Sequence, residues 1–111
     1  MGVREECQDT IAFVLIKAEL GMAGRVAAEA SSRNWEEENE SGVVVRGVHW
    51  AIEVTGPYDV VAAVRVKDNE ALGKLVVDEI QTIEGVKNPL TAVVTRHYKG
   101  GEPEAPHGGF P

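Results

Sequence analysis

The feature that most constrains the fold is a turn between two apolar segments, residues 54–61 (VTGPYDVV). Its centre, Gly56-Pro57, is typical of turns because proline presets the φ of a corner position. The residues before the turn alternate between apolar and polar, whereas residues 60–64 are all apolar. This pattern predicts two strands joined by a hairpin. Since a lone hairpin is marginally stable in water, we expect these strands to belong to a larger sheet.

The chain before this hairpin predicts a strand, a helix and a second strand. Residues 11–16 form an apolar run short enough for a buried strand. Met22, Val26 and Ala30 recur at helical spacing, and this first helix is expected to end near residues 31–34, or to continue for another turn over residues 35–38. Residues 36–41 predict an acidic loop. The next strand is expected at residues 43–45 and 48–55, with an interruption near Gly47.

The chain after the hairpin predicts a helix and a final strand. Asp68 or Asn69 is a candidate N-cap, and Gly85 is a suitable residue just beyond the helix end. The apolar face of this helix comprises Leu72, Leu75, Val76, Ile80 and Ile83. The last strand is expected at residues 90–95, preceded by a simple loop at residues 88–91. Residues 1–10 form a polar lead-in, and residues 99–111, rich in Gly and Pro, predict a mobile tail.

The order β-α-β-β-α-β predicts an α+β fold, the ferredoxin-like sandwich, with both helices on one face of a four-stranded sheet. The first, third and fourth strands are apolar on both faces; in the first, Phe13 and Leu15 lie opposite Val14 and Ile16. The helices cover only one face, and the other would expose more apolar surface than monomers usually show. We therefore expect an obligate homodimer whose sheets pack face to face, forming a dimeric α+β barrel.

Composition narrows the classes of function. The net charge is −7 and basic residues are not clustered, which argues against direct binding of nucleic acid. The single cysteine, Cys7, excludes an internal disulfide and fits a cytoplasmic location. No apolar run is long enough to span a membrane. His49, His97 and His107 are widely separated, so no metal site and no cofactor are expected.

Several residues allow both a structural and a functional interpretation. His49 is either a catalytic base in a barrel-like cavity or, as we favour, an ordinary strand residue. Trp50 is expected to pack in the core or an interface. Asp59 either accepts hydrogen bonds from backbone N–H groups at the turn, or, together with Gly56 and Tyr58, holds the amine and carboxylate of a small metabolite.

The sequences and the order of five segments resemble those of the ligand-binding domain of the Lrp/AsnC family, also called the RAM domain. The segments are 12–16 (AFVLI), 54–61 (VTGPYDVV), 72–77 (LGKLVV), 83–86 (IEGV) and 90–91 (LT). The resemblance covers about residues 11–98. The family's helix-turn-helix domain has no counterpart in the ten residues before the first strand, so the chain resembles the stand-alone type. About a dozen residues, roughly 33–46, are extra relative to the family's pattern.

The resemblance implies a ferredoxin-like fold that dimerises through its sheets and assembles further into an octamer-like ring. It implies binding of an amino acid or another small effector, with candidate ligand-binding residues Gly56, Pro57, Tyr58, Asp59 and Thr91. On this basis we expect a non-enzymatic effector sensor that modulates transcription indirectly, with a full-length Lrp/AsnC relative as a possible partner. The alternative is a small cofactor-free oxygenase or isomerase of the dimeric α+β barrel type, with a cavity lined by His49, Tyr58 or His97.

Overall fold

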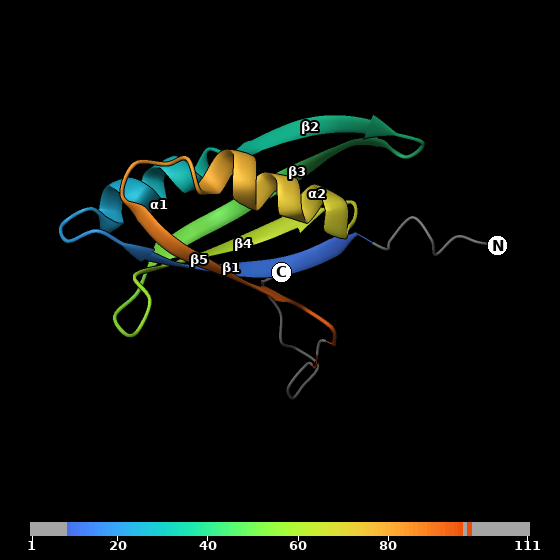
Figure 1. The fold of residues 1–111 in the computed structure, drawn as a ribbon. Helices are drawn as coiled ribbons and strands as arrows, with labels where there is room; N and C mark the ends of the chain where they lie inside the picture. The colour runs from blue at the N-terminus through green and yellow to red at the C-terminus, as the bar shows by residue number, and fades with distance from the viewer. Residues whose placement is uncertain (1–8, 97, 99–111) are drawn as a thin grey trace, which may run out of the picture.

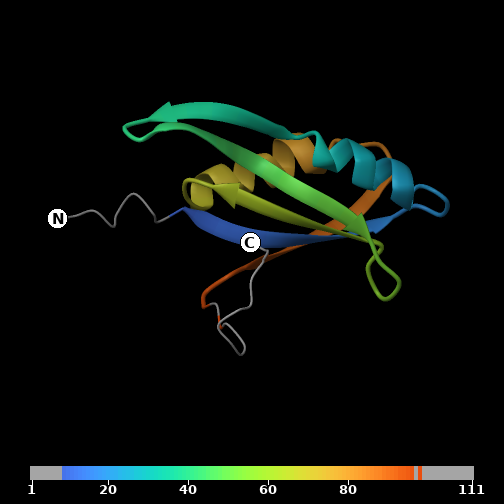
Figure 2. The ribbon, with the colours of Figure 1, turned by 180° about the vertical axis from the view of Figure 1, so that it is seen from behind.

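The computed structural model describes residues 9–96 and 98 (Figure 1). The expected tail, residues 99–111, and most of the expected lead-in lie outside the described residues. The elements are β1 (Thr10–Ala18), α1 (Ala23–Ser31), β2 (Asn34–Asn39), β3 (Gly42–Glu53), β4 (Val60–Val66), α2 (Asn69–Lys74), the π-helical η2 (Leu75–Ile80) and β5 (Val86–Val93). They form one antiparallel sheet in the order β2-β3-β4-β1-β5, with the helices on one face (Figures 1 and 2).

The ferredoxin-like α+β fold is confirmed, but the sheet has five strands rather than four. The extra strand is β2, which occupies the residues where we expected an acidic loop or a further helical turn. It pairs with β3 from Asn34 opposite Gly47 to Asn39 opposite Gly42. Three consecutive glutamates are tolerated because β2 is the edge of the sheet, where charged side chains reach water and discourage further strand pairing.

The predicted interruption near Gly47 is a β-bulge, with the register of β3 against β4 shifting between Val48 and Trp50. Gly47 has a φ of 101°. A Cβ at this position would lie 2.5 Å from the Arg33 carbonyl oxygen and 2.8 Å from Asn34 Cα. Only glycine satisfies both the positive φ and this close backbone approach. The bulge therefore marks the base of the β2–β3 hairpin arm, residues 34–47.

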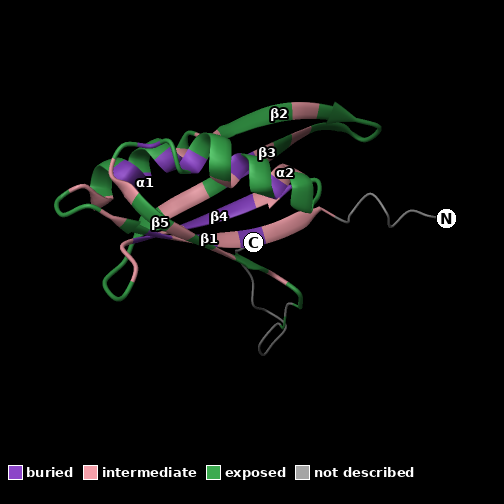
Figure 3. Cartoon of the chain, in the orientation of Figure 1, coloured by how far each residue is buried: buried purple, intermediate pink, exposed green. Residues whose placement is uncertain are grey.

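The core lies between the helices and one face of the sheet (Figure 3). Alternate residues of β1 and β4 point into it, and Val14, Ile16, Val60 and Val66 are fully buried. The helices supply Val26, Ala30, Leu72, Leu75 and Ile80 to the same core. Aliphatic side chains that alternate along strands and recur at helical spacing along the helices thus meet in one layer.

The second helix begins where the sequence predicted. The Asp68 carboxylate accepts a hydrogen bond of 2.8 Å from the Ala71 backbone N–H, as an N-cap does. Gly85 beyond the helix has a φ of 98°. However, β5 begins at Val86, so the expected loop at residues 88–91 is wrong. Pro89 fits within β5 because this strand is the other edge of the sheet, where a missing N–H donor is tolerated.

Replacing Gly73 by alanine should stabilise the fold. Gly73 lies within α2, and a Cβ built there has no heavy atom within 4 Å outside its own helix and chain neighbours. Alanine restricts the unfolded chain and has the higher helix propensity, so we expect a gain of about 0.5–1 kcal/mol. Chemical denaturation at fixed protein concentration measures this gain. The contrasting variant Gly47→Ala should be destabilised, and equal behaviour of the two variants would contradict the backbone assignment.

Candidate functional site

The predicted site residues Gly56, Pro57, Tyr58 and Asp59 lie on the turn between β3 and β4. Backbone hydrogen bonds close this turn, with Val54 N–H donating to the Asp59 carbonyl at 2.9 Å. A second set ties it to the end of β1, because Asp59 N–H donates to the Ile16 carbonyl at 2.9 Å and Lys17 Nζ donates to the Pro57 carbonyl at 3.0 Å. The turn is therefore a fixed corner at one end of the sheet.

The Asp59 carboxylate has a structural role within the protomer. Its Oδ2 accepts a hydrogen bond of 2.8 Å from the backbone N–H of Ala18, at the last position of β1. This is the backbone capping that one interpretation of Asp59 predicts, although the donor comes from a neighbouring strand rather than from the turn itself. The side chain is half-buried, so it still reaches the surface of the corner.

Thr91 lies away from this corner. It is in β5 opposite Val14, whereas the turn contacts β1 at Ile16 and Ala18. Four residues of β1 separate Val14 from Ala18, or about 13 Å at about 3.3 Å per residue. Moreover, β5 and β4 flank β1 on opposite sides. One protomer therefore brings Gly56, Pro57, Tyr58 and Asp59 together but leaves Thr91 apart from them.

The sheet face opposite the helices is apolar, and no element among residues 9–96 covers it. The strand register places Leu15 opposite both Val61 and Leu90, and Phe13 opposite Ala63. On the same face Trp50 lies beside Phe13, with ring centroids 6.1 Å apart. Ile52 and Leu90 are 47% and 52% exposed. A contiguous apolar face of this kind is typical of a surface that another protein chain covers.

A charged cluster that the sequence did not reveal joins the start of β1 to the hairpin arm. Arg46 donates to both oxygens of Asp9, at 3.2 and 3.0 Å, and Arg65 Nε donates to Asp9 Oδ2 at 2.9 Å. The Asp9 side chain is only 9% exposed. Burial raises the pKa of its carboxyl, but hydrogen bonds from Arg46 and Arg65 outweigh this effect and hold the pKa below its usual range.

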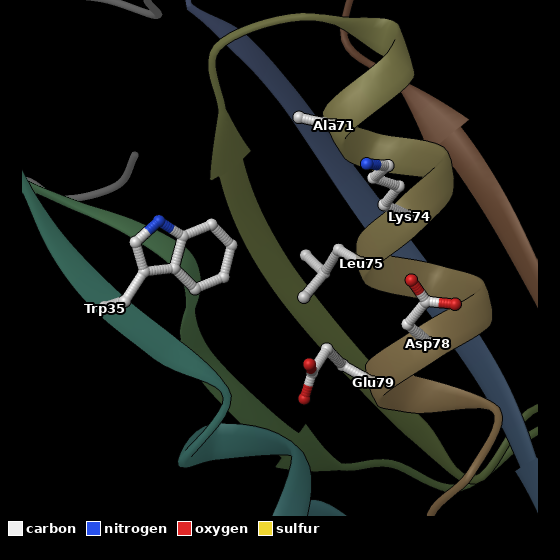
Figure 4. Close-up of a pocket in the computed structure, with 6 residues that line it drawn as sticks. All are labelled: Trp35, Ala71, Lys74, Leu75, Asp78 and Glu79. Carbon is white, nitrogen blue, oxygen red and sulfur yellow. The ribbon is translucent and has the colours of Figure 1, made fainter.

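The hairpin arm also forms one wall of a groove on the helix side of the sheet (Figure 4). Trp35 of β2 faces α2 and η2 across an open cavity of about 330 Å³. The other lining residues are Ala71, Lys74, Leu75, Asp78 and Glu79. The sequence did not indicate this groove, because residues 36–41 were expected to form a loop and residues 35–38 a possible further turn of the first helix.

Within the described residues, His49 is not placed as the enzyme alternative requires of a catalytic base. His49 is exposed at the bulge, with Nε2 3.2 Å from the Val45 carbonyl oxygen, and no hydrogen bond found among residues 9–96 and 98 joins it to a carboxylate. His97 lies outside the described residues. Within the described part of the chain no three His, Cys, Asp or Glu residues are placed to hold a metal ion. None of the helices described is both long and apolar enough to cross a membrane.

Solved structures share this fold. The structure of TTHA0845 from Thermus thermophilus is 32% identical, covers 82% of this chain and 99% of its own, and has a TM-score of 0.63. E. coli AsnC is 21% identical with a TM-score of 0.66, over 85% of this chain and 56% of AsnC. The transcriptional regulator NMB0573 of Neisseria meningitidis, in complex with L-Met, is 22% identical with a TM-score of 0.60, over 82% of this chain and 53% of its own.

Sequence comparison gives one partial match and one that covers most of the chain. Homocitrate synthase of Sulfolobus acidocaldarius is 32% identical over 54 residues, which are 49% of this chain. Since this chain spans only 11% of that enzyme, the match does not assign the enzyme's activity to it. The model of the Lrp/AsnC ligand binding domain matches residues 11–103. The chain therefore belongs to the Lrp/AsnC ligand binding domain family.

Proposed function

We propose that this chain is a regulatory domain that binds an amino acid or a related small effector and modulates transcription indirectly through its state of assembly. The observation that carries the proposal is the uncovered apolar sheet face in a domain of a ligand-binding family. The complex of the related regulator NMB0573 with L-Met supports an amino acid as the class of effector. The protein acts without catalysis in this proposal.

Assembly begins with a homodimer. Two copies that pack their open sheet faces together remove Leu15, Ile52 and Leu90 from water and form a dimeric α+β barrel. Dimers then associate into a larger ring, such as an octamer, either alone or mixed with a full-length Lrp/AsnC relative. The hydrophobic effect stabilises the first step, since burial is worth about 25 cal/mol per Å² of apolar surface.

The effector site comprises Gly56, Pro57, Tyr58 and Asp59 of one protomer. Thr91 is too far along the sheet to join them in the same chain, so the proposal has Thr91 contributed by a neighbouring protomer. A site completed by two subunits couples binding to assembly. Because such coupling is reciprocal, an effector that tightens the contact between dimers is itself bound more tightly by the larger assembly.

The Asp59→Asn variant tests the site. Asparagine retains an oxygen that can accept the Ala18 N–H, so the corner stays folded, but it removes the negative charge proposed to hold the effector's ammonium group. We expect the effector-induced change in assembly size to be lost, with binding at this corner at least about tenfold weaker. A thermal-shift screen of the parent against the twenty amino acids identifies the effector, and light scattering then follows effector-induced changes in size.

Glu40→Gln, an exposed change at the tip of the hairpin arm, is the matched control and should respond like the parent. If Asp59→Asn also responds to the effector like the parent, the site assignment is wrong. If no amino acid stabilises the parent, the proposed class of effector is wrong.

A further inference from the structure

The groove between the hairpin arm and α2–η2 is separate from the proposed effector site. It lies on the helix side of the sheet, and a single protomer supplies all six of its lining residues. The β3–β4 turn is at the opposite end of β4, next to Ile16, whereas the arm leaves the sheet beside Thr10 and Val66. The cavity of about 330 Å³ is at the lower end of the range of about 300–1,000 Å³ that small-molecule sites occupy.

The aromatic wall of the groove is held in place by a chain of polar contacts. Trp35 Nε1–H donates to Glu37 Oε2 at 2.8 Å, and Glu37 Oε1 accepts from Arg46. Arg46 is in turn held by both oxygens of Asp9. An indole fixed by hydrogen bonds presents its face to a ligand with little loss of side-chain entropy on binding.

The opposite wall is formed mainly by the π-helical segment. Leu75, Asp78 and Glu79 belong to η2, and the backbone bond from Gln81 N–H to the Val76 carbonyl shows the wider helical turn. π-Helical segments are rare and frequently occur at functional sites. Here the segment places Leu75, which is only 2% exposed, at the floor of the groove facing Trp35, with charged groups around it (Figure 4).

The charges that line the groove are of both signs, and two of them are unused. Glu79 is paired with Arg33, with Nε and Oε1 3.7 Å apart. In contrast, the ion pairs found among the described residues include neither Lys74 nor Asp78. An ammonium group and a carboxylate thus lie four residues apart on the helical wall, across the groove from the Trp35 indole.

We propose that this groove binds a small zwitterion with an apolar side chain, such as a neutral α-amino acid. The ligand carboxylate lies against Lys74, its ammonium group against Asp78, and its side chain against Trp35, above the floor formed by Leu75. Charge complementarity selects this class, since an apolar ligand would leave both charges unused and an ion of one sign would meet a like charge. The site does not depend on dimerisation or on the proposed function of the β3–β4 turn.

Isothermal titration calorimetry in the Asp59→Asn background tests the groove alone. The probes are L-leucine, L-methionine and L-phenylalanine. We expect at least one to bind, and Lys74→Gln or Asp78→Asn to weaken that binding about tenfold or more. Trp35→Ala should abolish it. The matched controls Lys87→Gln and Glu36→Gln remove charges of the same signs outside the groove and should bind like the background.

Analogues that lack one charge test the zwitterion directly. For L-leucine these are 4-methylpentanoic acid, which lacks the ammonium group, and 3-methylbutylamine, which lacks the carboxylate. Each should bind about tenfold or more weakly than L-leucine, or not measurably. Absence of binding by all three amino acids to folded Asp59→Asn protein overturns the proposal, as does equal binding by the groove variants and their controls. Either result leaves the effect of Asp59→Asn on effector-induced assembly unchanged, so the two proposals fail separately.

Discussion

Leu15→Glu is expected to leave the chain folded and to abolish its dimerisation. Leu15 lies at the centre of the open face, opposite Val61 on one neighbouring strand and Leu90 on the other. Its side chain points away from the core, which is built from the alternate residues Val14 and Ile16. The substitution should therefore spare the core of the protomer and affect only the surface that the proposed dimer buries.

The expected effect on association is large because a two-fold interface contains the substitution twice. Burying a carboxylate without a partner costs at least about 2 kcal/mol, so two copies weaken dimerisation by at least about 4 kcal/mol, or about a thousandfold in Kd. Light scattering at micromolar concentration should give a dimer or larger assembly for the parent and a monomer for the variant, while circular dichroism shows the same fold for both.

Val77→Glu is the matched control for Leu15→Glu. Val77 is also an apolar residue, 56% exposed, but it lies on η2 rather than on the open sheet face. This variant should assemble like the parent. A parent protein that is monomeric at micromolar concentration would contradict the sheet-face dimer, and with it the proposed mechanism of assembly.

The parts of the fold that follow from local apolar patterns were predictable. The runs that became β1 and β4 are bounded by polar or turn residues, and the second helix has both a capping aspartate and a buried stripe. Prediction from apolar patterns fails at β2, because the exposed edge of a sheet tolerates a polar sequence that is also typical of a loop. It also fails at Pro89, because whether a strand tolerates proline depends on its position in the sheet, which local sequence does not encode.

The candidate sites also divide into residues that local sequence places together and residues that only the folded sheet brings together. Residues 56–59 are contiguous, so a turn dipeptide is enough to place them together at one corner. Thr91 was associated with them only through the family resemblance. Its distance from the turn depends on the register of β5 against β1, which pairs Thr91 with Val14 and which local sequence does not encode. The Asp9 cluster and the Trp35 groove depend on β2 pairing with β3. The valines at residues 43–45 predicted a strand there, but the mostly polar residues 34–39 gave no sign of its partner strand.

Asp9→Asn is expected to cause the largest loss of stability among single polar substitutions in the described chain. Asp9 is the shared acceptor for Arg46 and Arg65, and the Arg46 side chain is only 11% exposed. Neutralising the carboxylate leaves a largely buried guanidinium with Glu37 as its remaining ion-pair partner. Hydrogen bonds between charged groups contribute about 1.5–3 kcal/mol, so we expect a loss of about 2–3 kcal/mol near neutral pH.

The stabilisation of the fold by Asp9 should decrease as the pH falls into the acid range. Its pKa in the folded protein is lowered, so the carboxylate stabilises the fold fully above the unfolded pKa of about 3.9. This contribution declines as the pH falls through that value towards the lower pKa of the folded state. The difference in stability between parent and Asp9→Asn should therefore be constant above about pH 5 and shrink in acid. Urea denaturation at fixed protein concentration across this range measures it.

Hydrogen exchange then shows where the stability is lost. The cluster joins the start of β1 to β3 beside the bulge, so its removal should release the hairpin arm before the core. Amides of residues 34–46 should exchange faster in Asp9→Asn, while those of β1 and β4 at Val14 and Val64 should be affected less. Glu36→Gln, on the exposed edge of the same arm, should change neither stability nor exchange. If the control loses as much as Asp9→Asn, the arm is held by strand pairing alone and not by its buried charges.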